Sequence, residues 1–256
     1  MAERTWEEFV APYVDGYHHT VRGRVRTRVI DEHVRCHLAE PLGRLVDVGG
    51  GGGQQAIPLA RRGYEVVLLD PTEGMLERAA AALRAEPPEV RARVALVRGR
   101  GEEAARLVGS GFDGVLCHGV LMYLADARPL LASLAGLVRP GGLVSVVTKN
   151  ARTMATRPAL EGRWSEALAA FDSVSEVNGL GAFTRGDYLE ELTEQMERLG
   201  VEQIAWYGVR LFIDGSAHLP GVGEDEAMIT AVELEASRRD PYRQMSRLFH
   251  WVGRRR

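Results

Sequence analysis

Five consecutive glycines, Gly49–Gly53, directly follow the short and mainly apolar stretch Arg44–Val48. An apolar run that ends in glycines predicts a buried strand leading into a tight loop, because a chain of glycines turns freely and lets a ligand approach the backbone closely. The next residues, Gln54–Arg62, have the pattern of a helix, and Gly63 ends it. The sequence therefore predicts a strand, loop and helix unit whose loop can hold a ligand.

The spacing of this loop excludes two common phosphate-binding motifs. A dinucleotide fingerprint, G-x-G-x-x-G, would need a glycine at position 54 or 55, where the chain has glutamines. A Walker loop would end in Lys-Ser or Lys-Thr, and this loop ends in Gln54. Asp47 stands just before the turn, and its carboxylate suits a cationic amine better than a pyrophosphate. The loop thus favours a ligand other than a nucleoside polyphosphate.

A second carboxylate, Asp70, ends the next apolar stretch, Glu65–Asp70, about 20 residues further along. A carboxylate at that place can accept hydrogen bonds from both hydroxyls of a ribose. The alternative interpretation is an ordinary glycine-rich turn, with Asp70 serving only as a helix cap.

Strand-like and helix-like segments alternate along the first 150 residues, which predicts βαβ units and a doubly wound parallel sheet of the α/β class. The predicted strands cover residues 44–48, 65–70, 94–97, 112–117 and 143–148. The predicted helices cover residues 54–62, 75–84 and 130–138, the last ended by residues 139–142. Further on, a helix is expected at 187–199, strands at 203–213 and 248–252, and a helix near 225–238.

The 256 residues suit one domain with insertions. Residues 150–185 have no clear strand but contain scattered aromatic side chains, which indicates a cap over the carboxyl edge of the sheet. The expected parts are an N-terminal helical lid (1–40), a cofactor-binding half (41–149), an inserted cap (150–186) and a C-terminal half that completes the sheet (187–256). The last three arginines, 254–256, are expected to form a frayed tail.

Composition narrows the class of protein further. The net charge of −3 weakens the case for a wide nucleic-acid-binding face. No apolar run approaches the roughly 18–20 residues of a membrane helix, and the polar first residues are unlike a signal peptide. Cys36 and Cys117 stand apart, without the spacing of metal ligands or of a disulfide framework. We therefore expect a cytoplasmic protein without a metal site.

Several segments resemble the ordered motifs of class I S-adenosylmethionine-dependent methyltransferases. They are Val46-Asp47-Val48-Gly49-Gly50-Gly51, Leu69-Asp70-Pro71, residues 112–118 and residues 137–142. The resemblance implies a Rossmann-like, seven-stranded mixed sheet whose last strand is antiparallel, and S-adenosyl-L-methionine as the cofactor. It also implies that Asp47 lies under the methionine moiety, that Asp70 binds the ribose, and that residues 100–102 flank the adenine.

Over nearly the whole chain the sequence is similar to the bacterial tRNA 5-carboxymethoxyuridine methyltransferases. The matching pieces include residues 23–26, 118–121, 125–128, 150–151, 208–212, 233–235 and 240–242. By that resemblance, Arg26 reaches the cofactor carboxylate from the N-terminal helix, and His118 lies beside the cofactor. The cap of those tRNA enzymes has a lysine-rich run, whereas residues 172–184 of this chain contain no basic residue.

Some candidate residues have two interpretations. Arg26 is either a ligand of the cofactor or part of the solvated face of a helix. His118 is either a base or a wall of the cofactor site, and Tyr17 belongs either to the entrance or to a surface turn. Arg210 pairs either with an anionic group of the substrate or with one of Glu233 and Glu235.

The complete expectation is a methyltransferase that acts on a small molecule, through a carboxylate or hydroxyl oxygen. The expected cofactor-binding residues are Arg26, Asp47, Gly49, Gly50, Gly51, Gly53, Asp70, Pro71, Met75, Arg100, Gly101, Glu102 and His118. The expected substrate residues are Tyr17, Tyr123, Asn150, Trp164 and Arg210. The alternatives are a tRNA methyltransferase and, from another class, a cofactor-binding protein without transferase activity.

Overall fold

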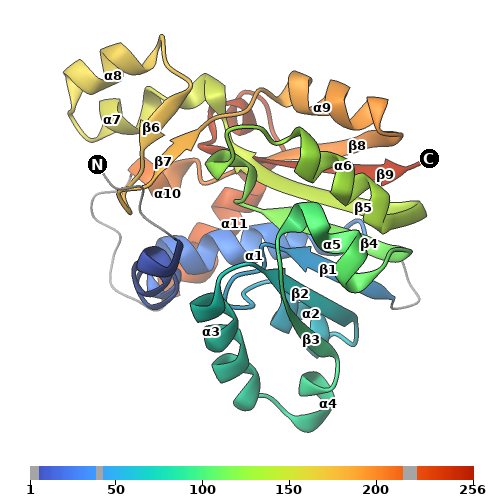
Figure 1. Cartoon of the computed structure of the whole chain (residues 1–256). Coiled ribbons are helices and arrows are strands. Elements are labelled where there is room, and N and C mark those ends of the chain that lie inside the picture. The colour runs from blue at the N-terminus through green and yellow to red at the C-terminus, as the bar shows by residue number, and fades with distance from the viewer. Residues whose placement is uncertain (1–5, 39–42, 216–223) are drawn as a thin grey trace.

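Seven strands form one mixed sheet in a computed structural model that describes residues 6–38, 43–215 and 224–256. The strand order is β3-β2-β1-β4-β5-β9-β8. The strands are β1 (Arg44–Val48), β2 (Glu65–Asp70), β3 (Val94–Arg98), β4 (Phe112–His118), β5 (Val138–Lys149), β8 (Val201–Val209) and β9 (Leu248–Arg255). Strand β9 runs antiparallel to its neighbours β5 and β8, and the other neighbouring pairs are parallel (Figure 1). The predicted mixed sheet with an antiparallel last strand is confirmed.

Helices cover both faces of the sheet, and each face has its own apolar core. One core joins the sheet to α5 (Ala104–Val108), α6 (Arg128–Leu137) and α9 (Leu189–Arg198). The other joins it to α1 (Val21–Arg35), α2 (Ala56–Arg61), α3 (Glu73–Arg84), α4 (Pro88–Arg91) and α11 (Glu224–Ser237). Successive strand residues face opposite cores, as Leu45 and Val46 do, which explains why the strands are apolar throughout. Within the described ranges, no helix is long and apolar enough to cross a membrane.

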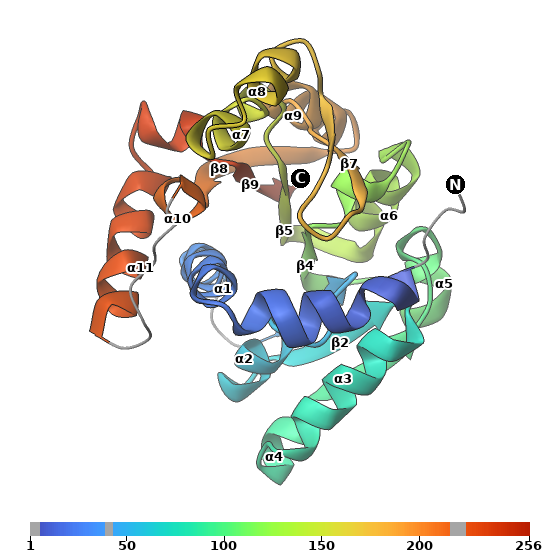
Figure 2. The same ribbon diagram turned by 90° about the vertical axis from the view of Figure 1, so that its left-hand side faces the viewer.

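The described part of the predicted helical lid consists of three short helical turns followed by α1. They are η1 (Trp6–Phe9), η2 (Ala11–Gly16) and η3 (Tyr17–His19). Thr20 then caps α1 by accepting a hydrogen bond from the backbone N–H of Gly23 at 3.1 Å. Figure 2 shows these turns lying across the molecule from α1 toward α3. Residues 1–5 and 39–40 of the predicted lid lie outside the described residues.

Two contacts hold these turns against α3. The carboxylate of Glu7 accepts hydrogen bonds from the backbone N–H groups of Glu73 and Gly74, at 2.9 and 3.2 Å. These are free donors at the start of a helix, where a negative charge is favoured. Val10 and Met75 are both buried in a small apolar cluster of their own. The N-terminal segment is therefore bound to the first turn of α3.

Residues 150–186, the predicted cap, contain a hairpin that the sequence analysis did not predict. The cap elements are η6 (Ala151–Thr153), α7 (Thr156–Leu160), α8 (Trp164–Ala170), β6 (Ser175–Val177) and β7 (Phe183–Arg185). Strands β6 and β7 pair antiparallel. The side chain of Asn178 closes their turn by accepting hydrogen bonds from the backbone N–H groups of Leu180 and Ala182, at 2.9 and 3.1 Å. Each strand has only three residues, too few to show an alternating pattern in the sequence.

The ends of several elements also differ from the prediction. Strand β5 begins at Val138, so the predicted turn at 139–142 is part of its start. Strand β8 ends at Val209, and Ile213 belongs to the short helix α10 (Phe212–Gly215). The carboxylate of Glu233 turns the chain there, because it accepts hydrogen bonds from the backbone N–H groups of residues 211–213 at 2.7–3.0 Å. The remaining turns are η4 (Gly101–Glu103), η5 (Leu121–Tyr123) and η7 (Tyr242–Met245).

The C-terminal arginines are not a frayed tail, because Arg254 and Arg255 lie in β9. The Arg255 guanidinium donates to the carbonyl oxygens of Ala135 and Val138, at 2.8 and 2.6 Å. Ala135 lies in the last turn of α6 and Val138 directly follows that helix, where helix oxygens lack partners within the helix. Pairing in a strand and satisfying a helix end together hold the last residues in place.

Candidate active site

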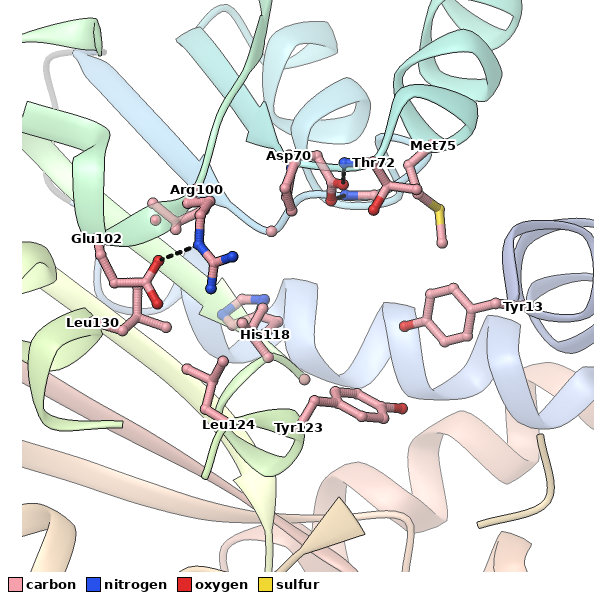
Figure 3. A pocket seen from close by; sticks show the side chains of 17 residues that line it. Tyr13, Asp70, Thr72, Met75, Arg100, Glu102, His118, Tyr123, Leu124 and Leu130 are labelled. Atoms are coloured by element: carbon pink, nitrogen blue, oxygen red, sulfur yellow. Dashed lines mark hydrogen bonds and ion pairs between the residues drawn. The ribbon is translucent and has the colours of Figure 1, made fainter. Parts of the chain in front are cut away.

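A cavity of about 300 Å³ opens at the carboxyl ends of β1, β2 and β4, and we call it the loop cavity (Figure 3). Ten of the residues predicted from the sequence line it: Gly49, Gly51, Asp70, Pro71, Met75, Arg100, Gly101, Glu102, His118 and Tyr123. The sequence analysis missed seven other lining residues: Tyr13, Val48, Thr72, Gly119, Val120, Leu124 and Leu130. Most of the missed residues are apolar or backbone groups, which carry no chemical signal in a sequence.

The Asp70 carboxylate is the most firmly held polar group of the loop cavity. It accepts hydrogen bonds from the backbone N–H groups of Gly51 and Thr72, both at 2.9 Å. Burial raises the pKa of Asp70, and the two backbone hydrogen bonds oppose that rise. The N-cap residue of α3 is Thr72, and Glu7 accepts from the free N–H groups of the first turn, so the contact of Asp70 with this helix is limited to the N–H of Thr72. Both carboxylate oxygens of Asp70 are thus held in place at the wall of the loop cavity.

Asp47 lies buried beneath the glycine loop and does not line the cavity surface. Its Oδ2 has no hydrogen-bond partner in the described part of the chain. Burial, together with the charge of Asp70, raises the pKa of Asp47 to about 7. A Cβ on Gly50 would lie 2.8 Å from that Oδ2, so only glycine fits above the carboxylate. Gly50 and Gly53 also stay outside the cavity lining, and they shape the loop instead.

A second cavity of about 270 Å³ adjoins the first, and we call it the basic cavity. The two share Tyr13, Gly119 and Tyr123. Six cationic side chains line it: Arg22, Arg26, Lys149, Arg157, Arg210 and Arg247. Of these, the sequence analysis named only Arg26 and Arg210 as site residues. Tyr17, which it assigned either to the entrance or to a surface turn, also lines this cavity.

Arg26 is buried on α1 and belongs to the lining of the basic cavity. Its guanidinium makes no hydrogen bond or ion pair within residues 6–38, 43–215 and 224–256. By contrast, Arg24 and Arg28 both pair with Glu226, at 2.7 and 2.6 Å. The solvated-face interpretation of Arg26 is therefore wrong. A Cβ on Gly119 would lie 3.3 Å from Nη2 of Arg26, which places this guanidinium where the two cavities meet.

Arg210 has an internal partner, but a different one from the two glutamates considered above. Its guanidinium pairs with Asp214 at 2.7 Å and lies 5.4 Å from the ring centre of Tyr17. Arg210 also has a φ of 65°, and among the described residues it is the one non-glycine residue with a positive φ. Such backbone strain is common at ligand sites, where the surrounding structure holds the residue in place. Arg210 is thus fixed at the wall of the basic cavity.

Two carboxylates, the partly buried Glu176 and the buried Asp214, neutralise part of the charge of the basic cavity. Glu176 pairs with Lys149 at 2.6 Å and also contacts Arg247. Asp214 lies 3.6 Å from Arg22 and 3.5 Å from Arg247, in addition to its contact with Arg210. Burial lowers the pKa of Lys149 to about 8, and its pairing with Glu176 opposes that fall.

Two predicted substrate residues lie outside both cavities. The Asn150 side chain is buried, and it donates hydrogen bonds to the carbonyl oxygens of Gln244 and Ser246 at 3.1 and 3.0 Å. Its polar groups hold the chain together and are not free for a substrate. Trp164 is 71% exposed on α8 and lines neither cavity. Trp164 was predicted to contact the substrate because the cap is rich in aromatic residues, but its side chain faces solvent.

His118 ends β4 and lines the loop cavity. Its Nε2 lies 2.8 Å from Oγ of the buried Ser145, and its Nδ1 has no partner among the described residues. Burial, together with the charge of Arg26, lowers the pKa of His118 to about 3. The imidazole is therefore neutral over the physiological range.

The chain was compared with protein families, with curated proteins and with solved structures, and methyltransferases match it in each comparison. Residues 46–144 match the family model described as a methyltransferase domain. The chain is 26% identical over its full length to a tRNA 5-carboxymethoxyuridine methyltransferase of Escherichia coli O157:H7, covering 97% of that protein.

Two solved structures share the fold. One, from Thermotoga maritima, is described as a possible histamine N-methyltransferase. It is 18% identical, with a TM-score of 0.61 and 98% of each chain covered. The other is the 1,6-didemethyltoxoflavin-N1-methyltransferase of Burkholderia thailandensis, solved with 1,6-didemethyltoxoflavin and S-adenosylhomocysteine. It is 19% identical, with a TM-score of 0.57, covering 97% of this chain and 87% of that one.

Proposed function

We propose that this S-adenosylmethionine-dependent methyltransferase acts on a negatively charged small molecule, which binds in the basic cavity and accepts the methyl group on a carboxylate or hydroxyl oxygen. The observation that carries the proposal is the charge of this cavity. Six cationic side chains line it, and five of them pair with three carboxylates, Glu161, Glu176 and Asp214, while Arg26 has no partner among the described residues. Cations in excess of their internal partners favour an anionic ligand, because a buried charge needs a counter-charge.

The residues of the loop cavity fit the cofactor. In this proposal, Asp70 accepts hydrogen bonds from the ribose hydroxyls, and residues 100–102, which line the same cavity, flank the adenine. The unpartnered Oδ2 of Asp47 suits the ammonium group of the methionine moiety. Arg26, at the junction of the cavities, suits the cofactor carboxylate. With Arg26 used in this way, five cations of the basic cavity remain against three carboxylates.

Positioning supplies most of the catalysis in this proposal. Bound S-adenosylmethionine supplies an electrophilic methyl group on a positively charged sulfonium. The shared wall of the two cavities, formed by Tyr13, Gly119 and Tyr123, sets the distance between the acceptor and that methyl group. A carboxylate acceptor is ionised at neutral pH and needs no base. With a carboxylate acceptor no proton is released, and the neutral His118 orients a ligand. A hydroxyl acceptor would release its proton to solvent as the methyl group is transferred.

A tRNA substrate is the second candidate, and the full-length similarity to the Escherichia coli tRNA enzyme favours it. The cap of this chain is less suited to RNA. Its α8 exposes Trp164 and Leu168, the next residue, Phe171, is exposed as well, and residues 172–184 contain no basic side chain. Most of the affinity for tRNA comes from neutralising phosphates. We therefore favour the small molecule.

The test uses S-adenosylmethionine labelled with tritium in the methyl group. The full-length protein is incubated either with total bacterial tRNA or with the small-molecule ultrafiltrate of a bacterial extract. We expect label in small molecules that an anion-exchange column retains before methylation, and no tRNA complex in a gel shift at physiological salt. Label in RNA, with a salt-dependent submicromolar complex, would establish the tRNA function instead.

Two matched variants of the cap link this activity to the basic cavity. Arg157 and Arg163 both pair with Glu161, but only Arg157 lines the basic cavity. We expect Arg157→Met to lower methylation of the anionic acceptor and Arg163→Met to leave it unchanged. Both variants should bind S-adenosylhomocysteine as the wild type does. Equal activity of the two variants would contradict the assignment of the basic cavity to the acceptor.

A further inference from the structure

A chain of buried hydrogen bonds connects α11 with the loop cavity through three histidines. His33 Nε2 lies 2.8 Å from Oγ of Ser237, and His33 Nδ1 lies 3.3 Å from Nδ1 of His250. His250 Nε2 lies 2.7 Å from Oγ of Ser145, which in turn lies 2.8 Å from Nε2 of His118. All five side chains are buried, so their polar atoms depend on partners within the protein.

The direction of every hydrogen bond in this series follows from its first member, Ser237. Ser237 Oγ lies 2.7 Å from the carbonyl oxygen of Leu234, which can only accept, so the single hydroxyl hydrogen of Ser237 points there. Ser237 must then accept from His33, whose Nε2 carries the hydrogen. A neutral His33 has a bare Nδ1, so the hydrogen between the two Nδ1 atoms belongs to His250.

The same reasoning continues to the loop cavity. Because its Nδ1 carries the hydrogen, a neutral His250 has a bare Nε2, which accepts from the hydroxyl of Ser145. Ser145 must in turn accept from His118, whose Nε2 carries the hydrogen and whose Nδ1 is bare. Burial supports neutral rings throughout, since it lowers the pKa of His33 and His118 to about 3 and that of His250 well below its usual value.

We infer that Ser145 and His250 are positioning residues, which hold His118 as the Nε2–H tautomer and leave its Nδ1 as an uncharged hydrogen-bond acceptor for the cofactor. Nδ1 is the atom of His118 without a partner in the described structure, and His118 lines the loop cavity. The cofactor carries two positive groups, a sulfonium and an ammonium. A protonated histidine would repel both, whereas a bare nitrogen can accept a hydrogen bond. The inference rests on the cofactor and is independent of the acceptor proposed above.

The first test needs no variant. The full-length protein is labelled with ¹⁵N-histidine, saturated with S-adenosylhomocysteine and examined by NMR, which distinguishes the two neutral tautomers. We expect Nε2–H for His33 and His118, and the opposite Nδ1–H for His250. A protonated His118, or an Nδ1–H tautomer of His118, would overturn the inference.

The second test compares two buried serines. Ser145→Ala removes the hydroxyl of the chain, while Ser246→Ala removes a buried hydroxyl without a partner in the described structure. We expect Ser145→Ala to give a mixture of His118 tautomers and to raise the Kd for S-adenosylhomocysteine about fivefold, the typical effect of one hydrogen bond. Ser246→Ala should change neither quantity. Equal effects of the two variants, or an unchanged tautomer in Ser145→Ala, would refute the positioning role.

Discussion

The backbone N–H of Gly51 donates a hydrogen bond to Oδ2 of Asp70 at 2.9 Å, and this contact joins the glycine loop after β1 to the end of β2. Gly51 has a φ of 55°, in the left-handed region that favours glycine, which turns its N–H toward the carboxylate. The loop and the carboxylate are therefore parts of one structure. A change in either should alter the other.

Replacing Asp70 should weaken cofactor binding. In Asp70→Ala, the ribose hydroxyls and the N–H of Gly51 lose their acceptor, which should cost roughly 1–3 kcal/mol of binding free energy. Titration calorimetry with S-adenosylhomocysteine measures this. Glu77→Gln, an exposed carboxylate on α3, is the control and should bind normally. An unchanged affinity of Asp70→Ala would remove Asp70 from the ribose site.

Replacing Arg26 should reduce binding without reducing stability. The guanidinium is buried and without a partner in the described residues, so Arg26→Met removes an unfavourable charge from the free protein. We expect the Kd for S-adenosylhomocysteine to rise at least about tenfold, the typical loss of a charged hydrogen bond, and the Tm of the free protein to stay equal or rise. Arg24→Met, which breaks the contact with Glu226, should lower the Tm and leave the Kd unchanged. The opposite pattern would make Arg26 a structural residue.

The ionisation of Asp47 should make the stability of the free protein depend on pH. The pKa of Asp47 is about 7 in the folded protein, against 3.8 for an ordinary carboxyl group. Between pH 4 and 7 the unfolded chain has therefore lost a proton that the folded protein still holds. Stability must fall as the pH rises through this range, by up to roughly 4 kcal/mol. Urea unfolding at several pH values checks this, with Asp47→Asn as the variant in which that part of the slope disappears.

The same carboxylate should make cofactor binding depend on pH in the opposite direction. A cationic ammonium group favours the ionised form, so binding at pH 6 should release a proton, and affinity should rise as the pH approaches and passes 7. Calorimetry of S-adenosylhomocysteine binding in buffers with different ionisation enthalpies counts that proton. No proton release from the wild type at pH 6 would show that Asp47 does not face the ammonium group.

The C-terminal residues should contribute to stability. Arg255→Ala leaves the carbonyl oxygens of Ala135 and Val138 without their donor, so we expect a loss of about 1–3 kcal/mol in the free energy of unfolding. Arg256→Ala removes only an exposed pair with Glu202 at 3.3 Å, and it should change stability by less than about 1 kcal/mol. Chemical denaturation compares the two. Equal stabilities would return Arg255 to the frayed-tail interpretation.

The sequence alone was sufficient to predict the strands of the sheet and most of the polar residues that line the loop cavity. An apolar strand that is followed by glycines, such as the one that contains Asp47, can be recognised from a few adjacent residues. Asp70, Pro71 and Met75 follow the next strand directly, so the geometry of parallel strands brings them to the same edge. Features of this kind depend on residues that are close together in the sequence, so the sequence is enough to predict them.

Only the tertiary structure assembled the basic cavity and the histidine chain. Arg26 comes from α1, Lys149 from the end of β5, Arg210 from just after β8, and Arg247 from just before β9. No local pattern relates these positions, and in sequence Arg26 could not be distinguished from its solvated neighbours. Whether a charged or polar side chain lacks a partner depends on what the fold packs around it. That is decided by contacts between distant segments, because burial removes the water that would otherwise satisfy each group.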